Sequence, residues 1–217
     1  MAAGQVHRTQ GGALDCIKDV RNEQRLSRDT GKAVRFSAGA AGDAVWRHKM
    51  ALRTIRRFGD PVLEKHCKEV TELTPRLNEL IDDMFDTMYD AGGVGLAAPQ
   101  VGVLKRIVVI DVSQEQNEPL VLINPVIVET SGEQTGLEGC LSLPGEYGEV
   151  TRPNYVKVTA LDRNMKERTL EGTELLARCF CHEIEHLDGH LFTEKVEGEL
   201  VSPEESGENE DDAAEKE

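Results

Sequence analysis

The stretch that most constrains this chain is His182-Glu183-Ile184-Glu185-His186, near the end of an apolar run from Thr173 to Leu187. We expect a helix here, begun by Thr173 and ended by Gly189. Side chains four residues apart on a helix lie one above the other, about 6 Å apart along its axis. Both histidines can therefore reach one metal ion, with Glu183 beside them as a candidate general base. A helix gives only two ligands, so the rest of the chain decides what kind of site this is.

The two ends of the chain differ in composition from its middle. Residues 1–49 carry nine Lys and Arg against five Asp and Glu and have no sustained hydrophobic period, whereas residues 194–217 carry two against eleven. We therefore expect three parts: an extension over 1–49 outside the fold, a catalytic domain over 50–197, and an acidic disordered tail over 198–217. Organellar targeting by the first part is the alternative, but transit peptides are poor in acidic residues.

Composition excludes several classes of protein. The 217 residues are 39% hydrophobic and 30% charged, which is ordinary for one soluble domain. No apolar run is long enough to span a bilayer, and the first residues lack a secretory signal. The net charge of −15 argues against nucleic-acid binding. Five cysteines, an odd number, fit reduced thiols in the cytoplasm better than a disulfide framework.

The middle of the chain predicts a helix, then strands, then the histidine helix. Thr74 and Pro75 suit the start of the first helix. Its apolar face consists of Leu77, Leu80, Ile81, Met84, Phe85 and Met88. We expect strands over 106–112, 120–123, 126–128, 156–161 and 167–170, with a break at Asn124-Pro125 and a Gly- and Glu-rich loop before residue 156. Because the strands cluster between two helices, we predict an α+β domain rather than βαβ units.

A glycine-rich stretch follows the first helix. Residues 93–98 fit the G-x-G-x-x-G/A spacing of dinucleotide-binding loops, but that motif needs a strand before it and a helix after it. Here the order is reversed, so the dinucleotide interpretation fails. A helix end with a tight turn suits Gly92 and Gly93, yet it does not explain Gln100, a polar residue just before an apolar strand.

The third metal ligand has several candidates. His190 would lie about 12 Å from His182 along a helix, too far for one ion. The position of a third metzincin-type histidine is Phe192. Cys140 lies in a Gly- and Pro-bounded segment, and a thiolate is a strong ligand, although a buried structural cysteine fits that segment as well. Cys179 shares the face of His182 and is expected in the core or a pocket wall.

Three motifs together resemble the peptide deformylase family. They are Gly93-Val94-Gly95-Leu96-Ala97-Ala98-Pro99-Gln100, Glu138-Gly139-Cys140-Leu141-Ser142 and His182-Glu183-Ile184-Glu185-His186. The similarity extends from about residue 50 to 197. It implies a compact α+β domain in which antiparallel or mixed sheets surround the histidine helix.

The resemblance also implies a metal centre. Cys140, His182 and His186 would hold one divalent ion, Fe²⁺ in most of the family, with Zn²⁺ or Ni²⁺ possible in the same site. A water in the fourth position would attack a formyl carbon, while Glu183 takes its proton and passes it to the departing amine.

The remaining roles concern the substrate. The amide of Gln100 and the backbone N–H of Leu141 would stabilise charge on the formyl oxygen. The backbone at Val94, Gly95 and Gly139 would line a groove for an extended peptide. The substrate would be the formyl-methionine end of newly made chains, which implies work near the ribosome, in the cytoplasm. Some family members carry a substrate-contacting arginine after the cysteine motif, and the residue near Tyr147 that replaces it is left open.

Two other functions compete with this interpretation. A metalloprotease of the H-E-x-x-H type would need a third His or Glu ligand in place of Cys140. A non-enzymatic domain with a structural metal site should have four protein ligands, and the sequence offers only three.

Overall fold

A computed structural model describes residues 51–202. The predicted extension and residues 203–217 of the predicted acidic tail therefore lie outside the described residues, and the domain boundaries stay predictions. The elements, in chain order, are α1 (Pro75–Asp90), β1 (Gly95–Ala97), the 3₁₀ turn η1 (Ala98–Val101), β2 (Ile107–Ile110), β3 (Leu120–Ser131), β4 (Gln134–Cys140), β5 (Leu143–Arg152), β6 (Tyr155–Leu161), β7 (Glu167–Thr173), α2 (Glu174–Leu187) and the 3₁₀ turn η2 (Phe192–Lys195).

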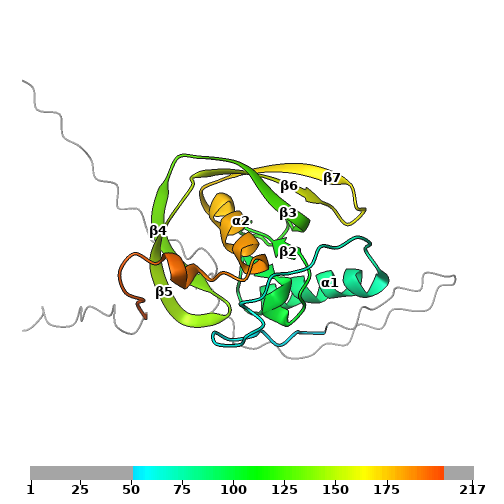
Figure 1. Cartoon of the computed structure of the whole chain (residues 1–217), viewed down its shortest axis with the longest axis horizontal. Coiled ribbons are helices and arrows are strands. Elements are labelled where there is room, and N and C mark those ends of the chain that lie inside the picture. Colours follow the sequence, from blue (N-terminus) through cyan, green and yellow to red (C-terminus); the bar gives the residue numbers. More distant parts are fainter. Residues whose placement is uncertain (1–50, 203–217) are drawn as a thin grey trace, which may run out of the picture.

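Five antiparallel strands form the main sheet, in the order β1-β2-β3-β6-β7. Side chains on a strand alternate between its two faces. In β2, Ile107 and Val109 pack into the apolar cluster around α1, whereas Val108 and Ile110 pack into the cluster around α2. The two helices therefore cover opposite faces of the same strands. Figure 1 shows α2 in the middle of the fold and α1 at the lower right.

The first helix forms as its sequence predicts. Thr74 lies at the N-cap and its side chain accepts a hydrogen bond from the Leu77 N–H at 3.3 Å, and Pro75 takes the first turn. The predicted apolar face is confirmed, because its residues from Leu80 to Met88 are buried and Leu77 is partly buried against the same cluster. The methionines fill the core between α1 and the sheet.

The predicted Gly- and Glu-rich loop is wrong, because this region forms a second sheet. Strands β4 and β5 pair along their length and are joined by the tight turn at Leu141 and Ser142. Glycine has a low strand propensity, which hid the hairpin. Tertiary packing explains the glycines: a Cβ at Gly139 would lie 2.8 Å from the Tyr147 ring, and one at Gly148 would overlap Val196.

The predicted break at Asn124-Pro125 is a shift of register inside one long strand, not a gap between two. The pairing of β3 with β6 shifts between Ile123 and Val126. Asn124 has a φ of 51°, and its side chain bonds both the N–H and the carbonyl of Val70, at 2.8 and 2.9 Å. This side chain takes the place of a strand partner, so the strand continues past the proline.

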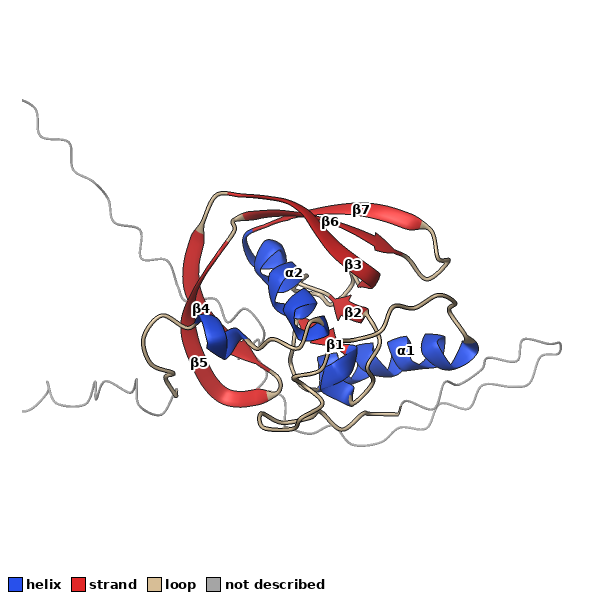
Figure 2. Ribbon diagram, viewed as in Figure 1, coloured by secondary structure: helices blue, strands red, loops and turns tan. Residues whose placement is uncertain are grey.

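Helix α2 runs under the main sheet and beside the β4–β5 hairpin (Figure 2). It begins after Thr173 as predicted, although the Thr173 side chain makes no capping hydrogen bond. It ends at Leu187, and Gly189 follows with a φ of 81°, packed against the backbone of Glu64 and Lys65. The α+β fold is confirmed. In the described part of the chain, no helix has the length and apolarity needed to cross a membrane.

Candidate active site

Helix α2 and the end of β4 bring three candidate metal ligands together. His182 and His186 lie one turn apart on α2 and are buried, with their Nε2 atoms 3.2 Å from one another. The Sγ atom of Cys140 lies 3.3 Å from the His186 Nε2 atom. The ligand atoms of all three residues lie within 4.8 Å of one another.

These separations fit a divalent metal ion. Bonds of about 2.0–2.3 Å to a tetrahedral ion would place neighbouring ligand atoms about 3.3–3.8 Å apart. The His186 Nε2 atom is already near that spacing from both the Cys140 sulfur and the His182 Nε2 atom, and a thiolate with two imidazoles is a donor set that suits Fe²⁺, Zn²⁺ and Ni²⁺. Cys140, His182 and His186 can therefore hold one ion and leave a fourth position to a small molecule.

Glu183 lies beside this cluster without a partner. Its side chain is fully buried, and neither oxygen accepts a hydrogen bond from the described residues. Burial raises the pKa of Glu183 to about 7, with the charge of His182 opposing this shift and that of Glu138 adding to it. A Cβ at Gly95 would overlap the Glu183 carboxylate, so only glycine at this position leaves the carboxylate its place.

Gln100 points its amide at the cluster. Its Oε1 atom accepts a hydrogen bond from the Ala97 N–H at 2.8 Å, which turns Nε2 the other way. Nε2 then lies 3.2 Å from the Ser142 hydroxyl and 3.5 Å from the Cys140 sulfur. The side chain is buried and held from both ends, so a donor N–H stands beside the metal position. This contact explains the polar residue that the turn interpretation left unexplained.

Leu141 follows the cysteine in the tight turn of the β4–β5 hairpin. Its carbonyl accepts a hydrogen bond from Arg57 at 2.9 Å, and its side chain packs against Gly93, where a Cβ would lie 2.7 Å away. The glycine stretch after α1 therefore packs directly against the cysteine motif. Its surroundings, a helix before it and β1 with η1 after it, are not those of a dinucleotide loop.

Two strand edges border the cluster. Paired residues in antiparallel strands alternate between bonding one another and bonding outward. The Val94 carbonyl bonds the Asp111 N–H of the β2 side, so the next residue, Gly95, directs its N–H and C=O away from β2. Tyr147 exchanges two hydrogen bonds with Val201, so its partner Gly139 directs its own groups away from β5. Gly95, which packs against Glu183, and Gly139, which precedes Cys140, thus direct backbone donors and acceptors away from their strand partners.

Two functional neighbours escaped the sequence analysis. Glu138, noted only as part of a motif, is fully buried with an oxygen 3.1 Å from the His182 Nδ1 atom. Residues i and i+2 of a strand share a face, so an E-x-C pattern would have indicated it had β4 been expected. Phe192, considered only as a missing ligand, stacks on the His182 ring with centroids 5.7 Å apart.

The charges of the site favour a cation. Burial opposes the ionisation of Glu138, but hydrogen bonds from His182 and Arg152 outweigh it and hold its pKa well below its usual value. Burial also opposes protonation of His182, but contacts with Cys140 and Glu138 outweigh it and raise its pKa to about 10. Burial lowers the pKa of His186 far below its ordinary value, which keeps that ring neutral, as a ligand must be.

Other residues weighed in the sequence lie elsewhere. His190 is exposed and its Nδ1 atom lies 2.9 Å from the Glu194 carboxylate, away from the cluster. Cys179 is buried in the apolar cluster between α2 and the sheet, as expected of a core residue.

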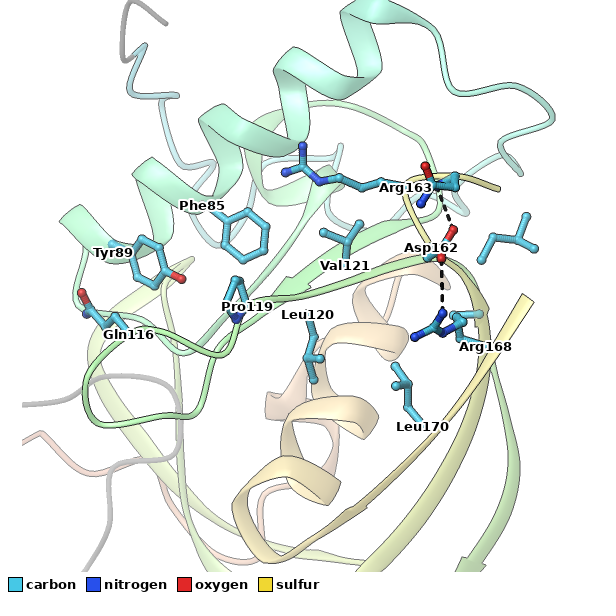
Figure 3. A pocket seen from close by; sticks show the side chains of 13 residues that line it. Phe85, Tyr89, Gln116, Pro119, Leu120, Val121, Asp162, Arg163, Arg168 and Leu170 are labelled. Carbon is cyan, nitrogen blue, oxygen red and sulfur yellow. Dashed lines mark hydrogen bonds and ion pairs between the residues drawn. The ribbon is translucent and has the colours of Figure 1, made fainter. Parts of the chain in front are cut away.

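A cavity of about 720 Å³ lies away from this site, between α1, the start of β3 and the β6–β7 turn. Figure 3 shows its apolar middle, with Phe85 above Pro119 and Leu120 and with Val121 to the right of Phe85. Two arginines line it, but Arg163 pairs with Asp82 at 2.6 Å and Arg168 lies 3.8 Å from Asp162. None of the metal-ligand candidates lines this cavity, so its size does not make it the site of chemistry.

Comparison with known proteins gives one family. The family model for polypeptide deformylase matches residues 52–200. A protein from Lachnoclostridium phytofermentans named peptide deformylase is 69% identical over 151 residues, which cover 70% of this chain and 93% of that protein.

Solved structures agree. The crystal structure of a peptide deformylase from Legionella pneumophila matches with a TM-score of 0.66 and 48% identity, over 68% of this chain and 87% of that one. A peptide deformylase from Synechococcus elongatus, solved in complex with actinonin, matches with a TM-score of 0.65 and 46% identity, over 69% of this chain and 82% of that one. The chain therefore belongs to the peptide deformylase family, metal-dependent enzymes that remove N-terminal formyl groups.

Proposed function

We propose that this chain hydrolyses the formyl group from the N-terminal formyl-methionine of newly made polypeptides and releases formate. The observation that carries the proposal is the meeting of Cys140, His182 and His186 with the buried Glu183 carboxylate and the Gln100 amide at one point. A hydrolase of a small formyl group needs strong polarisation of one carbonyl more than a large pocket, and this arrangement suits that need.

Cys140, His182 and His186 would hold the metal ion. We propose Fe²⁺ as the resident ion, with Zn²⁺ and Ni²⁺ as ions that the same donors can hold. When bound, the ion would act as a Lewis acid on water and on the formyl oxygen. The protein contributes the geometry: two ligands come from one helix and the third from a hairpin turn, so the ring planes and the thiolate are fixed before substrate arrives.

Glu183 would act as the general base and then as the general acid. Its carboxylate accepts no hydrogen bond from the described residues, so both oxygens are available to a water molecule in the site. The carboxylate would take a proton from the attacking water and then give it to the nitrogen of the departing methionine. Packing against Gly95 keeps it in reach of both atoms.

Gln100 and Leu141 would stabilise the charge that develops on the formyl oxygen. The Gln100 amide is fixed by Ala97 and Ser142, so it loses little freedom when it donates to that oxygen. The Leu141 N–H belongs to the peptide bond that follows the Cys140 ligand, which puts a second donor next to the metal position. Donors fixed in advance are the most effective kind for such charge.

The peptide would bind as an added strand. Gly95 and Gly139 direct backbone groups away from their strand partners, and Val94 lies beside the first of them. An extended chain paired with these edges would place its formyl end beside Glu183. Backbone pairing of this kind accepts many side-chain sequences, which suits an enzyme of nascent chains. We therefore propose a cytoplasmic enzyme that works close to the ribosome.

Formate release tests the proposal. Protein purified without oxygen should release formate from a formyl-methionine peptide, and a metal chelator should stop the reaction. The same peptide carrying an acetyl group is the control, because it differs only by a methyl group on the reacting carbonyl, and it should not react. Cys140→Ser should lose nearly all turnover; retained peptide-bond cleavage in that variant would instead support a metalloprotease and refute the proposal.

A further inference from the structure

A line of charged side chains runs from His182 to the surface. Glu138 lies 3.1 Å from the His182 Nδ1 atom and accepts two hydrogen bonds from the Arg152 guanidinium, at 2.8 and 3.0 Å. A further nitrogen of Arg152 donates to Glu185 at 2.7 Å, and Glu185 accepts from Lys195 of η2 at 2.5 Å. The side chains become more exposed outward, from 0% at Glu138 and 2% at Arg152 to 20% at Glu185 and 51% at Lys195.

The inner half of this line, Glu138 and Arg152, controls which nitrogen of His182 is available to bind a metal ion. A neutral imidazole carries one N–H, and the ring nitrogen that faces a carboxylate keeps the proton. When a metal ion takes the place of the proton on Nε2, Nδ1–H stays donated to Glu138 and the Nε2 lone pair would point to the ion beside Cys140 and His186. The Arg152 fork bonds both oxygens of Glu138, and Arg178 donates to one of them at 2.9 Å, so that carboxylate cannot rotate away from the ring.

The outer half explains how a buried arginine keeps this geometry. Arg152 faces two carboxylates, and an arginine fork with both sides occupied has one orientation. Glu185 lies on α2, one residue before His186, so its bond to Arg152 ties the ligand helix to β5. Removing a partner of a buried charge costs more than removing an exposed one, so effects should fall from Glu138 outward.

We propose that Arg152 is a positioning residue for the metal centre: with Glu138 it fixes His182, and Glu185 holds Arg152 in turn. This inference rests on the metal centre of the proposed function. It predicts that the protein binds the metal more weakly the closer the removed contact lies to His182.

Metal binding to purified protein tests it, with Co²⁺ as the probe ion and a chelator as the competitor. Glu138→Gln and Arg152→Lys should each weaken Co²⁺ binding by about 10- to 100-fold and change the visible absorption of the Co²⁺ protein. Glu185→Gln should weaken it less, and Lys195→Gln by at most about 2-fold because the pair is exposed. Circular dichroism should confirm that each variant is folded at the temperature of the measurement.

Arg106→Lys is the matched control. Arg106 pairs with Asp188 at 2.5 Å, so it holds the end of α2 to the sheet without touching His182 or Glu138. A purely structural role of Arg152 predicts that both lysine variants lower the unfolding temperature and leave Co²⁺ affinity and absorption unchanged. That result would overturn the inference, and so would an equal loss of Co²⁺ affinity in both.

Two further outcomes separate the proposals. If Arg152→Lys does not fold, Glu185→Gln decides, and Co²⁺ affinity equal to that of the wild type would overturn the role of the line. A wild type that binds Co²⁺ with the expected order of variants but releases no formate would refute the proposed function and support this inference. Formate release with normal Co²⁺ binding in Arg152→Lys would refute the inference alone.

Discussion

Helices α1 and α2 pack on opposite faces of the same strands but bury different side chains. Apart from Asp83 and Thr87, α1 buries apolar residues such as Met84 and Met88. Helix α2 buries charged or ligand residues along much of its length, Arg178, His182, Glu183 and His186 among them. Three of these four have close polar partners, and Glu183 is the exception. One face of the sheet thus provides stability, and the other provides a chemically active interior.

The largest effect should follow from Glu183→Gln on the α2 side. We expect kcat for formate release to fall by about 10²- to 10⁴-fold, because the amide cannot take the proton from water. Metal content and stability should not fall, because the carboxylate accepts no hydrogen bond from the described residues that the amide would lose. Glu79→Gln, on the exposed side of α1, is the control and should keep full activity. More than a tenth of wild-type turnover in Glu183→Gln would contradict the assigned base.

Met84→Ala should instead destabilise the apolar cluster around α1. The side chain is fully buried, so its loss should lower the free energy of unfolding by about 2–5 kcal/mol. Urea unfolding measures this change. Metal affinity in the folded protein should stay the same, because the ligand Cys140 packs in a separate cluster with Val150 and Phe192, and the α1 cluster meets the cysteine motif at Leu141. Lost metal affinity with unchanged stability would show that the two faces are not separate.

A smaller effect distinguishes the starts of the two helices. Thr74→Ala removes a side-chain hydrogen bond to the Leu77 N–H and should cost about 1 kcal/mol of stability. Thr173→Ala is the matched variant on α2, where the side chain makes no capping hydrogen bond, so it should cost less. Thermal unfolding of both proteins compares them. A larger loss at Thr173 would mean that the start of α2 depends on this hydroxyl.

The smallest effect is expected in the large cavity. Leu170→Phe extends a side chain into it and should change stability by at most about 1 kcal/mol. The value of kcat/KM for a formyl-methionine peptide should stay within about twofold of the wild type, because no site residue lines the cavity. Steady-state kinetics would reveal any larger change, and such a change would couple this cavity to the active site.

The parts that the sequence predicts well are those with a regular pattern. The face of α1 repeats at helical spacing, and Val156, Val158 and Ala160 alternate along β6 and are buried as alternation requires. The position of His182 and His186 on one face of α2 is predicted by their spacing of four residues. Because Cys140 alone fits a structural cysteine as well as a ligand, only its combination with the other motifs singled it out.

The parts that the sequence misses depend on contacts between distant segments. The glycines of β4 and β5 oppose strand formation locally, and three of them, Gly136, Gly139 and Gly148, are accommodated because Arg178, Tyr147 and Val196 fill the space around them. Glu138 gains its position only when that hairpin meets α2. The roles assigned to Gln100, Leu141 and Glu183 remain predictions, and the kinetics of Glu183→Gln test the last of them.

The order of the three ligands along the chain has a consequence for biosynthesis. Cys140 is made 42 residues before His182 and 46 before His186. While the polypeptide is still growing, the thiol waits without either imidazole, in a hairpin whose docking partner does not yet exist. A chain truncated before residue 186 lacks a complete ligand set. With this proposed ligand set, an ion can be loaded only after residue 186 has been made, so possession of the metal would mark a chain synthesised through α2.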